Sequence, residues 1–321
     1  MKYRLVTLIA FLVAVTAIAV TTHQLSLTTT KPPTVHAPLK PKLLSYLGVY
    51  EDGAPPGFQP VTQFARMATR KPNLVGYYSG WAEPFNIAFA DMVHSHGVVP
   101  FVQIDPRFAS VSAIAAGAYD GYLRSYADSV RAYRHSVVIG FGHEMNATWY
   151  PWGYGHVRPS TFAAAWRHVV TIFRGEGAEN VTWLWTINQD SPGSGRVALW
   201  WPGAKYVTWV GIDGYYLRPS DKFYNVFGKT IQQVRAFTKK PILLSETGIG
   251  KGSGRFKNIL DLFNGMQKYR TLGLVWFDKN QHDISIYHQD WRLEDDGLAT
   301  TAFQLGIART LRSSANLAGA R

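Results

Sequence analysis

The sequence predicts a single (β/α)₈ barrel over residues 43–310, in which eight parallel strands are surrounded by helices. Short runs rich in β-branched and aromatic residues recur along this span, and longer stretches with helical spacing follow most of them. Such alternation implies parallel strands joined by helical crossovers. Carboxylates, amides and aromatic residues also gather at the carboxyl ends of the runs, where barrels of this type carry their functional sites.

Eight candidate strands and four clear helices can be placed on the chain. The strands begin near Leu43, Asn73, Val98, Val137, Val181, Val207, Pro241 and Leu272. The helices are expected at 85–96, 119–134, 160–175 and 222–238, while 191–205 is expected to be a loop with at most one helical turn. A doubly wound open sheet is the alternative architecture, but no glycine fingerprint for a dinucleotide or phosphate follows an early strand.

The composition excludes several classes of protein. The chain has 321 residues, of which 46% are hydrophobic, enough for a large core. It has no cysteine, so disulfides, thiolate metal sites and cysteine nucleophiles are excluded. The net charge is +12, but the basic residues are scattered and fit no nucleic-acid motif. We therefore expect no nucleic-acid partner, and weak attraction to an acidic surface accounts for the charge.

The first 42 residues predict export and a stalk. A short basic start precedes an apolar run at 5–20, which is typical of a signal peptide and shorter than a comfortable membrane span of roughly 20 residues. An uncleaved signal anchor is the alternative. Residues 21–42 are rich in Thr, Pro and Lys and predict an extended linker. We expect a secreted or extracellular protein, with a membrane tether through 5–20 if the segment is retained, and a disordered tail at 311–321.

Two glutamates stand at the ends of buried strands. Glu144 follows the apolar run 137–143 on the fourth strand, and Glu246 follows 242–245 on the seventh. An unpaired buried carboxylate is costly, so a salt-bridged structural residue is the alternative interpretation of each one. Glycoside hydrolysis uses such a pair, one carboxylic acid and one carboxylate. Strands four and seven lie on opposite walls of an eight-stranded barrel, so the two side chains can converge across its mouth.

Other hydrolytic motifs are incomplete. His143 and Glu144 begin the zinc motif H-E-x-x-H, but Ala147 occupies the position of the second histidine. The serine motif G-x-S-x-G is missing. We therefore expect no metal and no cofactor.

Four segments carry a resemblance to a known family. GFGHEMNATWYPWG at 140–153 closely resembles the acid/base segment of glycoside hydrolase family 26, which includes β-mannanases and related β-glucanases and xylanases. LLSETG at 243–248 resembles its nucleophile segment, and 200–216 resembles the region of its sixth strand. DWRLEDD at 290–296 is also similar. The resemblance covers most of residues 43–310.

The resemblance implies roles for the central residues. Glu144 corresponds to the acid/base and Glu246 to the nucleophile. His143 corresponds to the family histidine that helps to bind sugar and to orient the carboxylates. Tyr215 corresponds to the tyrosine that hydrogen-bonds the nucleophile, but Tyr216 is a rival because the parity of the strand decides which side chain points inward.

The resemblance also implies binding residues around the pair. Trp149 and Trp276 correspond to sugar platforms, although either could instead belong to the core. Asn146, Trp81 and Asp278 are candidate subsite residues. One position departs from the pattern, since many members carry an arginine four residues before the acid/base and this chain has Gly140.

The expected function is that of a retaining, endo-acting glycoside hydrolase on a β-linked polysaccharide such as β-mannan, β-glucan or xylan, acting as a monomer. A non-catalytic carbohydrate-binding barrel is the first alternative, because it would keep the fold and the aromatic platforms. A cell-surface enzyme that processes exopolysaccharide is the second.

Overall fold

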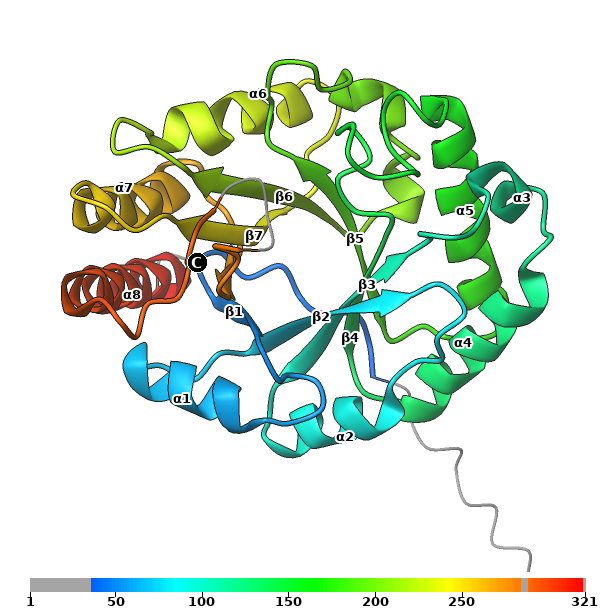
Figure 1. The fold of residues 1–321 in the computed structure, drawn as a ribbon. Coiled ribbons are helices and arrows are strands. Elements are labelled where there is room, and N and C mark those ends of the chain that lie inside the picture. The colour runs from blue at the N-terminus through cyan, green and yellow to red at the C-terminus, as the bar shows by residue number, and fades with distance from the viewer. Residues whose placement is uncertain (1–35, 284–287, 320–321) are drawn as a thin grey trace, which may run out of the picture. The chain divides into compact units, whose positions relative to one another are not determined.

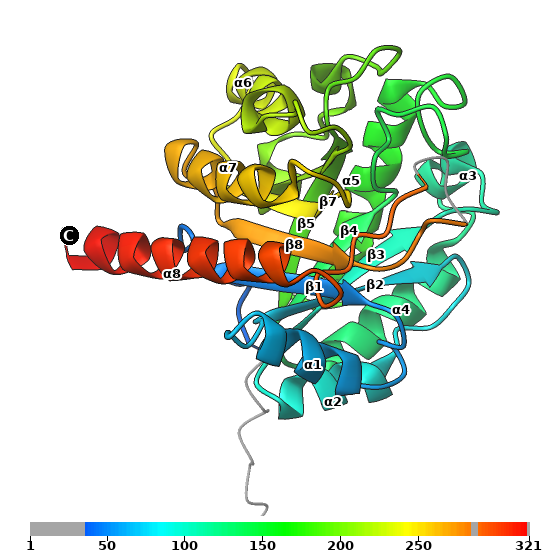
Figure 2. The same ribbon diagram turned by 60° about the vertical axis from the view of Figure 1, so that its left-hand side comes forward.

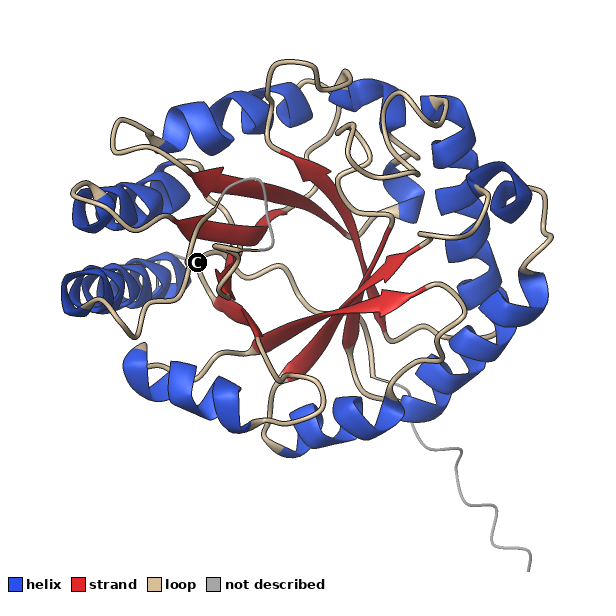
Figure 3. Ribbon diagram, viewed as in Figure 1, coloured by secondary structure: helices blue, strands red, loops and turns tan. Residues whose placement is uncertain are grey.

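The structure is a computed structural model that describes residues 36–283 and 288–319. Within them, eight parallel strands form a closed barrel in chain order, with β1 paired to both β2 and β8. The helices form a ring outside the strands (Figures 1 and 3). The predicted (β/α)₈ barrel is thereby confirmed. The predicted signal segment and most of the linker lie outside the described residues.

The strands are β1 (Tyr46–Glu51), β2 (Leu74–Gly80), β3 (Val99–Asp105), β4 (Val137–Phe141), β5 (Val181–Asn188), β6 (Trp209–Tyr216), β7 (Ile242–Ile249) and β8 (Gly273–Asp278). The α-helices are α1 (Gln59–Met67), α2 (Ile87–Ser95), α3 (Val111–Ala115), α4 (Asp120–Tyr133), α5 (Pro159–Gly175), α6 (Lys229–Arg235), α7 (Arg255–Lys268) and α8 (Gly297–Gly319). A π-helical turn, η3 (Tyr224–Gly228), precedes α6, and two 3₁₀ turns, η1 (Val197–Trp200) and η2 (Ala204–Tyr206), lie between β5 and β6.

The expected elements agree with these bounds. Each predicted strand start lies within three residues of a strand, and the four predicted helices correspond to α2, α4, α5 and the η3–α6 segment. The connection 191–205 was expected to hold at most one helical turn, but it contains the 3₁₀ turn η1 and the start of a second, η2. The main difference is β4, which ends at Phe141 and leaves Glu144 on the turn that follows.

Two apolar layers hold the barrel together. Alternate strand residues point inward and fill the barrel with large side chains, since successive strand residues face opposite sides. The inner set is Tyr50, Leu74, Phe101, Val138, Leu184, Trp209, Leu243, Val275 and Phe277. The remaining buried strand residues face outward and pack against the helices in a second, larger cluster. The polar residues at the inward positions nearest the mouth are therefore set on a rigid, fully packed base.

Residues 36–42 belong to the folded unit, although the linker was expected to extend to residue 42. The backbone N–H of Leu39 donates to Oγ1 of Thr182 at 2.8 Å, and the side chain of Leu39 packs against the inner cluster. The N–H of His36 donates to the carbonyl of Arg134 at 2.8 Å. These contacts lie at the amino-terminal ends of β4 and β5, away from the mouth.

The tail expected from residue 311 is also different, because α8 continues without interruption to Gly319. Figure 2 shows α8 beside α7, with the two helices on the same side of the barrel. Phe303 of α8 packs against Phe263 of α7, with ring centroids 5.3 Å apart, and against Trp276 of β8 at 5.2 Å. No helix in the described part of the chain is long and apolar enough to span a bilayer.

Barrel closure imposes a glycine at the start of β8. Gly273 has a φ of +153° and pairs with Tyr46 of β1, and a Cβ at this position would lie 1.8 Å from the carbonyl oxygen of Tyr46. We predict that Gly273→Ala lowers the free energy of unfolding by about 3 kcal/mol, because backbone must move at the closing seam.

The matched control is Gly121→Ala in α4, where no atom lies within 4 Å of the added methyl group. That change should be neutral or stabilise the helix by up to about 1 kcal/mol. The midpoint of thermal unfolding measures both variants. Equal midpoints for the two would contradict this account of the seam.

Candidate active site

The backbone after β4 turns Glu144 into the barrel mouth. Gly142 and Glu144 both have left-handed conformations, with φ of +55° and +54°. The N–H of Glu144 donates to the carbonyl of Thr186 on β5 at 3.0 Å, which ties this turn to the neighbouring strand. A left-handed non-glycine residue costs energy and clusters at functional sites. The carboxyl group of Glu144 is consequently buried, with 7% of the residue exposed.

Burial controls the protonation of Glu144. It raises the pKa of the carboxyl group, and the charge of His143 opposes this effect. The nearby charge of Glu246 raises the pKa further, whereas the indole N–H of Trp149, which donates to Oε2 at 2.8 Å, lowers it. The net result is a pKa of about 7 for Glu144. This carboxyl group can therefore hold a proton near neutral pH and also release it.

An irregularity in β7 brings Glu246 to the same space. The pairing register of β7 shifts against β6 between Gly211 and Asp213, and against β8 between Leu244 and Thr247. Bulges of this kind re-aim side chains. As a result, the adjacent residues Ser245 and Glu246 both reach partners inside the barrel.

Two phenols hold the carboxylate of Glu246. Tyr78 of β2 donates its O–H to Oε2, and Tyr215 of β6 donates to Oε1. Burial raises the pKa of both tyrosines well above the usual value, and the negative charge of Glu246 adds to the effect. Both phenols therefore keep their protons. A carboxylate that accepts a hydrogen bond at each oxygen is fixed in orientation.

An ion pair between His143 and Asp105 lies beside the acid. Nδ1 of His143 lies 2.9 Å from Oδ1 of Asp105, and Nε2 lies 3.0 Å from the hydroxyl of Tyr150. Burial alone would lower the pKa of His143, but the charge and hydrogen bond of Asp105 outweigh it and raise the pKa to about 10. The imidazole is thus a cation at neutral pH. It supplies positive charge next to the two glutamates without contacting water freely, since it is 3% exposed.

A third carboxyl group lies in the same interior. Asp213 of β6 is 1% exposed and accepts a hydrogen bond from the hydroxyl of Ser245 at 2.5 Å. Burial raises its pKa well above the usual value, and the charges of Glu246 and Glu144 act in the same direction. These effects favour the neutral form of Asp213, which avoids a third negative charge beside the pair.

The structure distinguishes between the two rival tyrosines. Tyr215 points inward to Glu246, whereas Tyr216 points outward and donates to Oδ2 of Asp261 on α7 at 3.2 Å. Trp149, the other expected sugar platform, donates its indole N–H to Glu144 and remains 46% exposed.

The side chains of three other expected binding residues pack within the protein. Trp276 is fully buried between β8 and α8, because it occupies an outward position of the strand, so the expectation that it forms a sugar platform is wrong for this geometry. Trp81 packs against Tyr122 on α4, with ring centroids 4.8 Å apart. Asn146 is fully buried and exchanges two hydrogen bonds with the backbone of Asn188, so it joins the turn after β4 to the end of β5.

The remaining candidate, Asp278, lies beside Glu51 at the ends of β8 and β1. Its Oδ1 accepts from the N–H of Leu293 at 3.0 Å and from the indole of Trp276 at 3.2 Å. Burial raises the pKa of Asp278 to about 7 and that of Glu51 to about 10, and the proximity of these two groups contributes to the shift of Glu51. Asp278 therefore fixes the segment after β8.

Sequence reasoning missed Tyr78 and Tyr150, and it did not assign Asp105 as the partner of His143. Strand parity could have found two of them, since Tyr78 and Asp105 occupy inward positions at the ends of β2 and β3. Tyr150 lies on a turn, where no periodicity applies. In the described part of the chain, no three His, Asp or Glu side chains are arranged to hold a metal ion.

These features define a class: a (β/α)₈ barrel with two carboxyl groups in contrasting surroundings at the ends of β4 and β7. The model of glycosyl hydrolase family 26 matches residues 120–297, which include both glutamates. The chain therefore belongs to glycosyl hydrolase family 26, and this membership classes it as a glycosidase.

Individual proteins agree with this assignment. The chain is 28% identical over 272 residues to Endoglucanase H of Acetivibrio thermocellus, an alignment that covers 79% of this chain and 29% of that protein. It is 29% identical over 169 residues to the mannan endo-1,4-beta-mannosidase of Bacillus subtilis, covering 47% and 43% of the two chains. The chain thus spans less than half the length of these relatives.

The fold also matches solved structures. The catalytic domain of the endo-beta-1,4-mannanase of Bacillus sp. JAMB-750 superposes with a TM-score of 0.62 at 14% identity, covering 83% of this chain and 86% of that one. At this identity the match supports the fold alone.

Gly140, where the resemblance led us to expect an arginine, has a glutamine beside it. Gly140 of β4 pairs with Gln103 of β3, and a Cβ at Gly140 would lie 1.9 Å from Oε1 of Gln103. The amide of Gln103, which donates to Oγ1 of Thr186 at 3.0 Å, therefore occupies the space beside the glycine. We predict that Gly140→Arg alone lowers the free energy of unfolding by about 3 kcal/mol, because the core at this point is overpacked.

The double variant Gln103→Ala with Gly140→Arg frees that space and should recover part of the loss. Gln103→Ala alone is the control for the lost hydrogen bond. Thermal unfolding of the three variants measures the coupling. Simple additivity of the two single changes would contradict a direct clash.

Proposed function

We propose that this chain is a retaining glycosidase that cleaves a β-linked polysaccharide internally, with Glu144 as acid/base and Glu246 as nucleophile. The contrast between the two carboxyl groups carries the proposal. Glu144 is buried with a pKa of about 7 and can donate a proton, whereas both oxygens of Glu246 accept hydrogen bonds from phenols. A pair of carboxyl groups with different protonation states is what this chemistry requires.

The proposed reaction has two displacements. Glu144 gives its proton to the glycosidic oxygen while Glu246 attacks the anomeric carbon, so the C–O bond breaks and a glycosyl ester forms. Glu144, now a carboxylate, removes a proton from water, and the resulting hydroxide displaces Glu246. The two inversions retain the anomeric configuration. His143, held as a cation by Asp105, stabilises the negative charge that Glu144 carries between the steps.

The named relatives support a polymeric β-linked substrate. One is called an endoglucanase and another a mannan endo-1,4-beta-mannosidase, so a β-glucan and a β-mannan are the first substrates to test, with xylan as a third. The half-exposed ring of Trp149 beside Glu144 fits a sugar face next to the bond to be cleaved.

The direct test compares the wild-type chain with Glu144→Ala and Glu246→Ala on these three polysaccharides. We expect one polymer to be cut with new reducing ends, and each variant to lose at least about 10³-fold in kcat, roughly 4 kcal/mol of transition-state stabilisation. NMR of the first-formed product should show the retained anomer. An inverted anomer would refute the double displacement.

Azide gives a sharper assignment of the two roles. On an aryl glycoside with a good leaving group, Glu144→Ala with azide should yield a glycosyl azide of retained configuration, because Glu246 still forms the ester. Glu246→Ala with azide should yield the inverted azide, because azide replaces the nucleophile. If none of the polymers is cut but the folded chain binds one of them, the carbohydrate-binding barrel becomes the better description.

The pH dependence tests the indole hydrogen bond. As the acid, Glu144 works while protonated, so kcat/KM should fall as the pH rises through about 7. Trp149→Phe removes a donor that stabilises the carboxylate, so the pKa of Glu144 should rise and the alkaline limb should move to higher pH. Trp201→Phe, whose ring packs against Trp185 at 5.1 Å, is the control and should leave the limb in place. A limb that moves to lower pH in Trp149→Phe would contradict the assignment.

A further inference from the structure

The segment that follows β8 supports the phenol that holds Glu246. The ring of Trp291 lies against Tyr215, with centroids 4.5 Å apart, and Trp291 is fully buried. It fits beside Gly248 of β7, where a Cβ would lie 2.9 Å from the indole. Tyr215 therefore contacts Glu246 through its hydroxyl and Trp291 through its ring. A displacement of Trp291 would move Tyr215 and so alter its hydrogen bond to Glu246.

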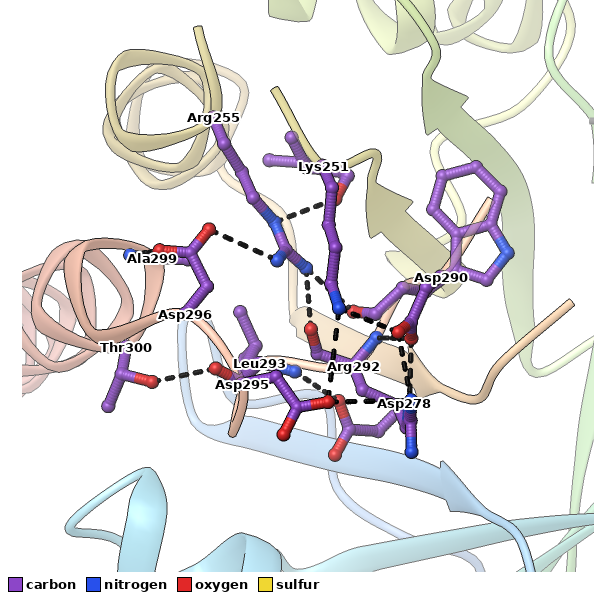
Figure 4. A network of polar contacts seen from close by, with 12 residues as sticks. Lys251, Arg255, Asp278, Asp290, Arg292, Leu293, Asp295, Asp296, Ala299 and Thr300 are labelled. Carbon is purple, nitrogen blue, oxygen red and sulfur yellow. Dashed lines mark hydrogen bonds and ion pairs between the residues drawn. The ribbon is translucent and has the colours of Figure 1, made fainter. Parts of the chain in front are cut away.

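A buried arginine holds the backbone of this segment. Arg255, at the start of α7, is 3% exposed. One of its terminal nitrogens donates to the carbonyls of Trp291 at 3.0 Å and of Arg292 at 2.8 Å. Nε donates to the carbonyl of Ile249 at 3.0 Å, and the other terminal nitrogen to Oδ2 of Asp296 at 3.3 Å (Figure 4). One guanidinium thus connects the end of β7, the start of α7 and the segment after β8.

The surrounding ion pairs are more exposed. Lys251 lies 2.7 Å from Asp290, which also pairs with Arg292 at 2.9 Å (Figure 4). The side chain of Lys251 is 42% exposed and that of Arg292 is 33% exposed. Exposed pairs contribute little to stability, whereas a buried charge whose partners are removed is costly. Arg255 is therefore the strongest of these charged contacts to the segment.

We propose that Arg255 is a positioning residue for the reaction, which acts by fixing the backbone of Trp291 so that Trp291 holds Tyr215 against Glu246. The predicted effect on kcat rests on the proposed function. The guanidinium offers five N–H donors in a planar fork, which suits several carbonyl groups that lie in different directions. A lysine keeps the charge but not the fork, so it does not replace the arginine here.

The kinetic test is a double-mutant cycle between Arg255→Met and Tyr215→Phe. Arg255→Met alone should lower kcat about tenfold with little change in KM, because it disturbs a group that acts in the transition state. In the Tyr215→Phe background, Arg255→Met should lower kcat by less than about twofold, because the hydrogen bond from Tyr215 through which it acts is already lost. An equal loss in both backgrounds would overturn the proposal, because a merely structural role lowers activity independently of Tyr215.

The matched control is Arg235→Met. Arg235 is a partly buried arginine at the end of α6, and it donates to the carbonyl of Lys240 at 2.8 Å. Lys240 lies just before β7, far along the chain from the segment after β8. The Arg235→Met substitution should leave kcat unchanged. Arg255→Lys retains the charge and most of the side-chain volume, so it provides a second variant if Arg255→Met does not fold, and it should show the same dependence on Tyr215.

Hydrogen exchange tests the anchor without any substrate. Peptides that cover 288–296 should exchange faster in Arg255→Met or Arg255→Lys than in the wild type and in Arg235→Met. This result would stand even if no polysaccharide were cleaved, so it separates a failure of the anchor from a failure of the proposed function. Unchanged exchange across 288–296 would overturn the proposal.

Discussion

The central constraint in this molecule is the repulsion between carboxyl groups that lie close together at the barrel mouth, two of which are buried. Glu144, Glu246 and Asp213 share the interior of the barrel mouth, and three negative charges there would destabilise one another. The three carboxyl groups have different surroundings, which reduce this repulsion. Glu246 receives two phenol donors, and Glu144 receives one indole donor and lies near the imidazolium of His143. Burial raises the pKa of Asp213 and so favours its neutral form.

The backbone irregularities follow from the same constraint. A regular β4 and β7 would alternate their side chains inward and outward, and they could not place these groups so densely. The left-handed turn at Glu144 and the register shift near Ser245 depart from that alternation at the two places where a carboxyl group must enter the mouth. The packed inner layer and the anchored segment after β8 then keep the arrangement rigid.

Much of the fold could be predicted from the sequence because its signals are local. Apolar runs and helical spacing gave all eight strands, and the glutamates stood out as charges at the ends of apolar runs. What could not be predicted depends on contacts between distant segments. The alternation of side chains along a strand did not by itself show which of Tyr215 and Tyr216 points inward. The sequence likewise did not show that Trp276 occupies an outward position of β8 and packs against α8. The glycine at position 140 depends on the amide of Gln103 on the neighbouring strand, a contact that no pattern along a single strand shows.

The most direct measurement is a titration of the glutamate side chains by ¹³C NMR, in the wild type and in Glu246→Gln. We predict that Glu144 titrates near pH 7 in the wild type and at lower pH in the variant, because the variant removes a neighbouring negative charge. A Glu144 that titrates near its ordinary value of 4.5 in both proteins would contradict the central claim that burial and the charge of Glu246 raise the pKa of Glu144.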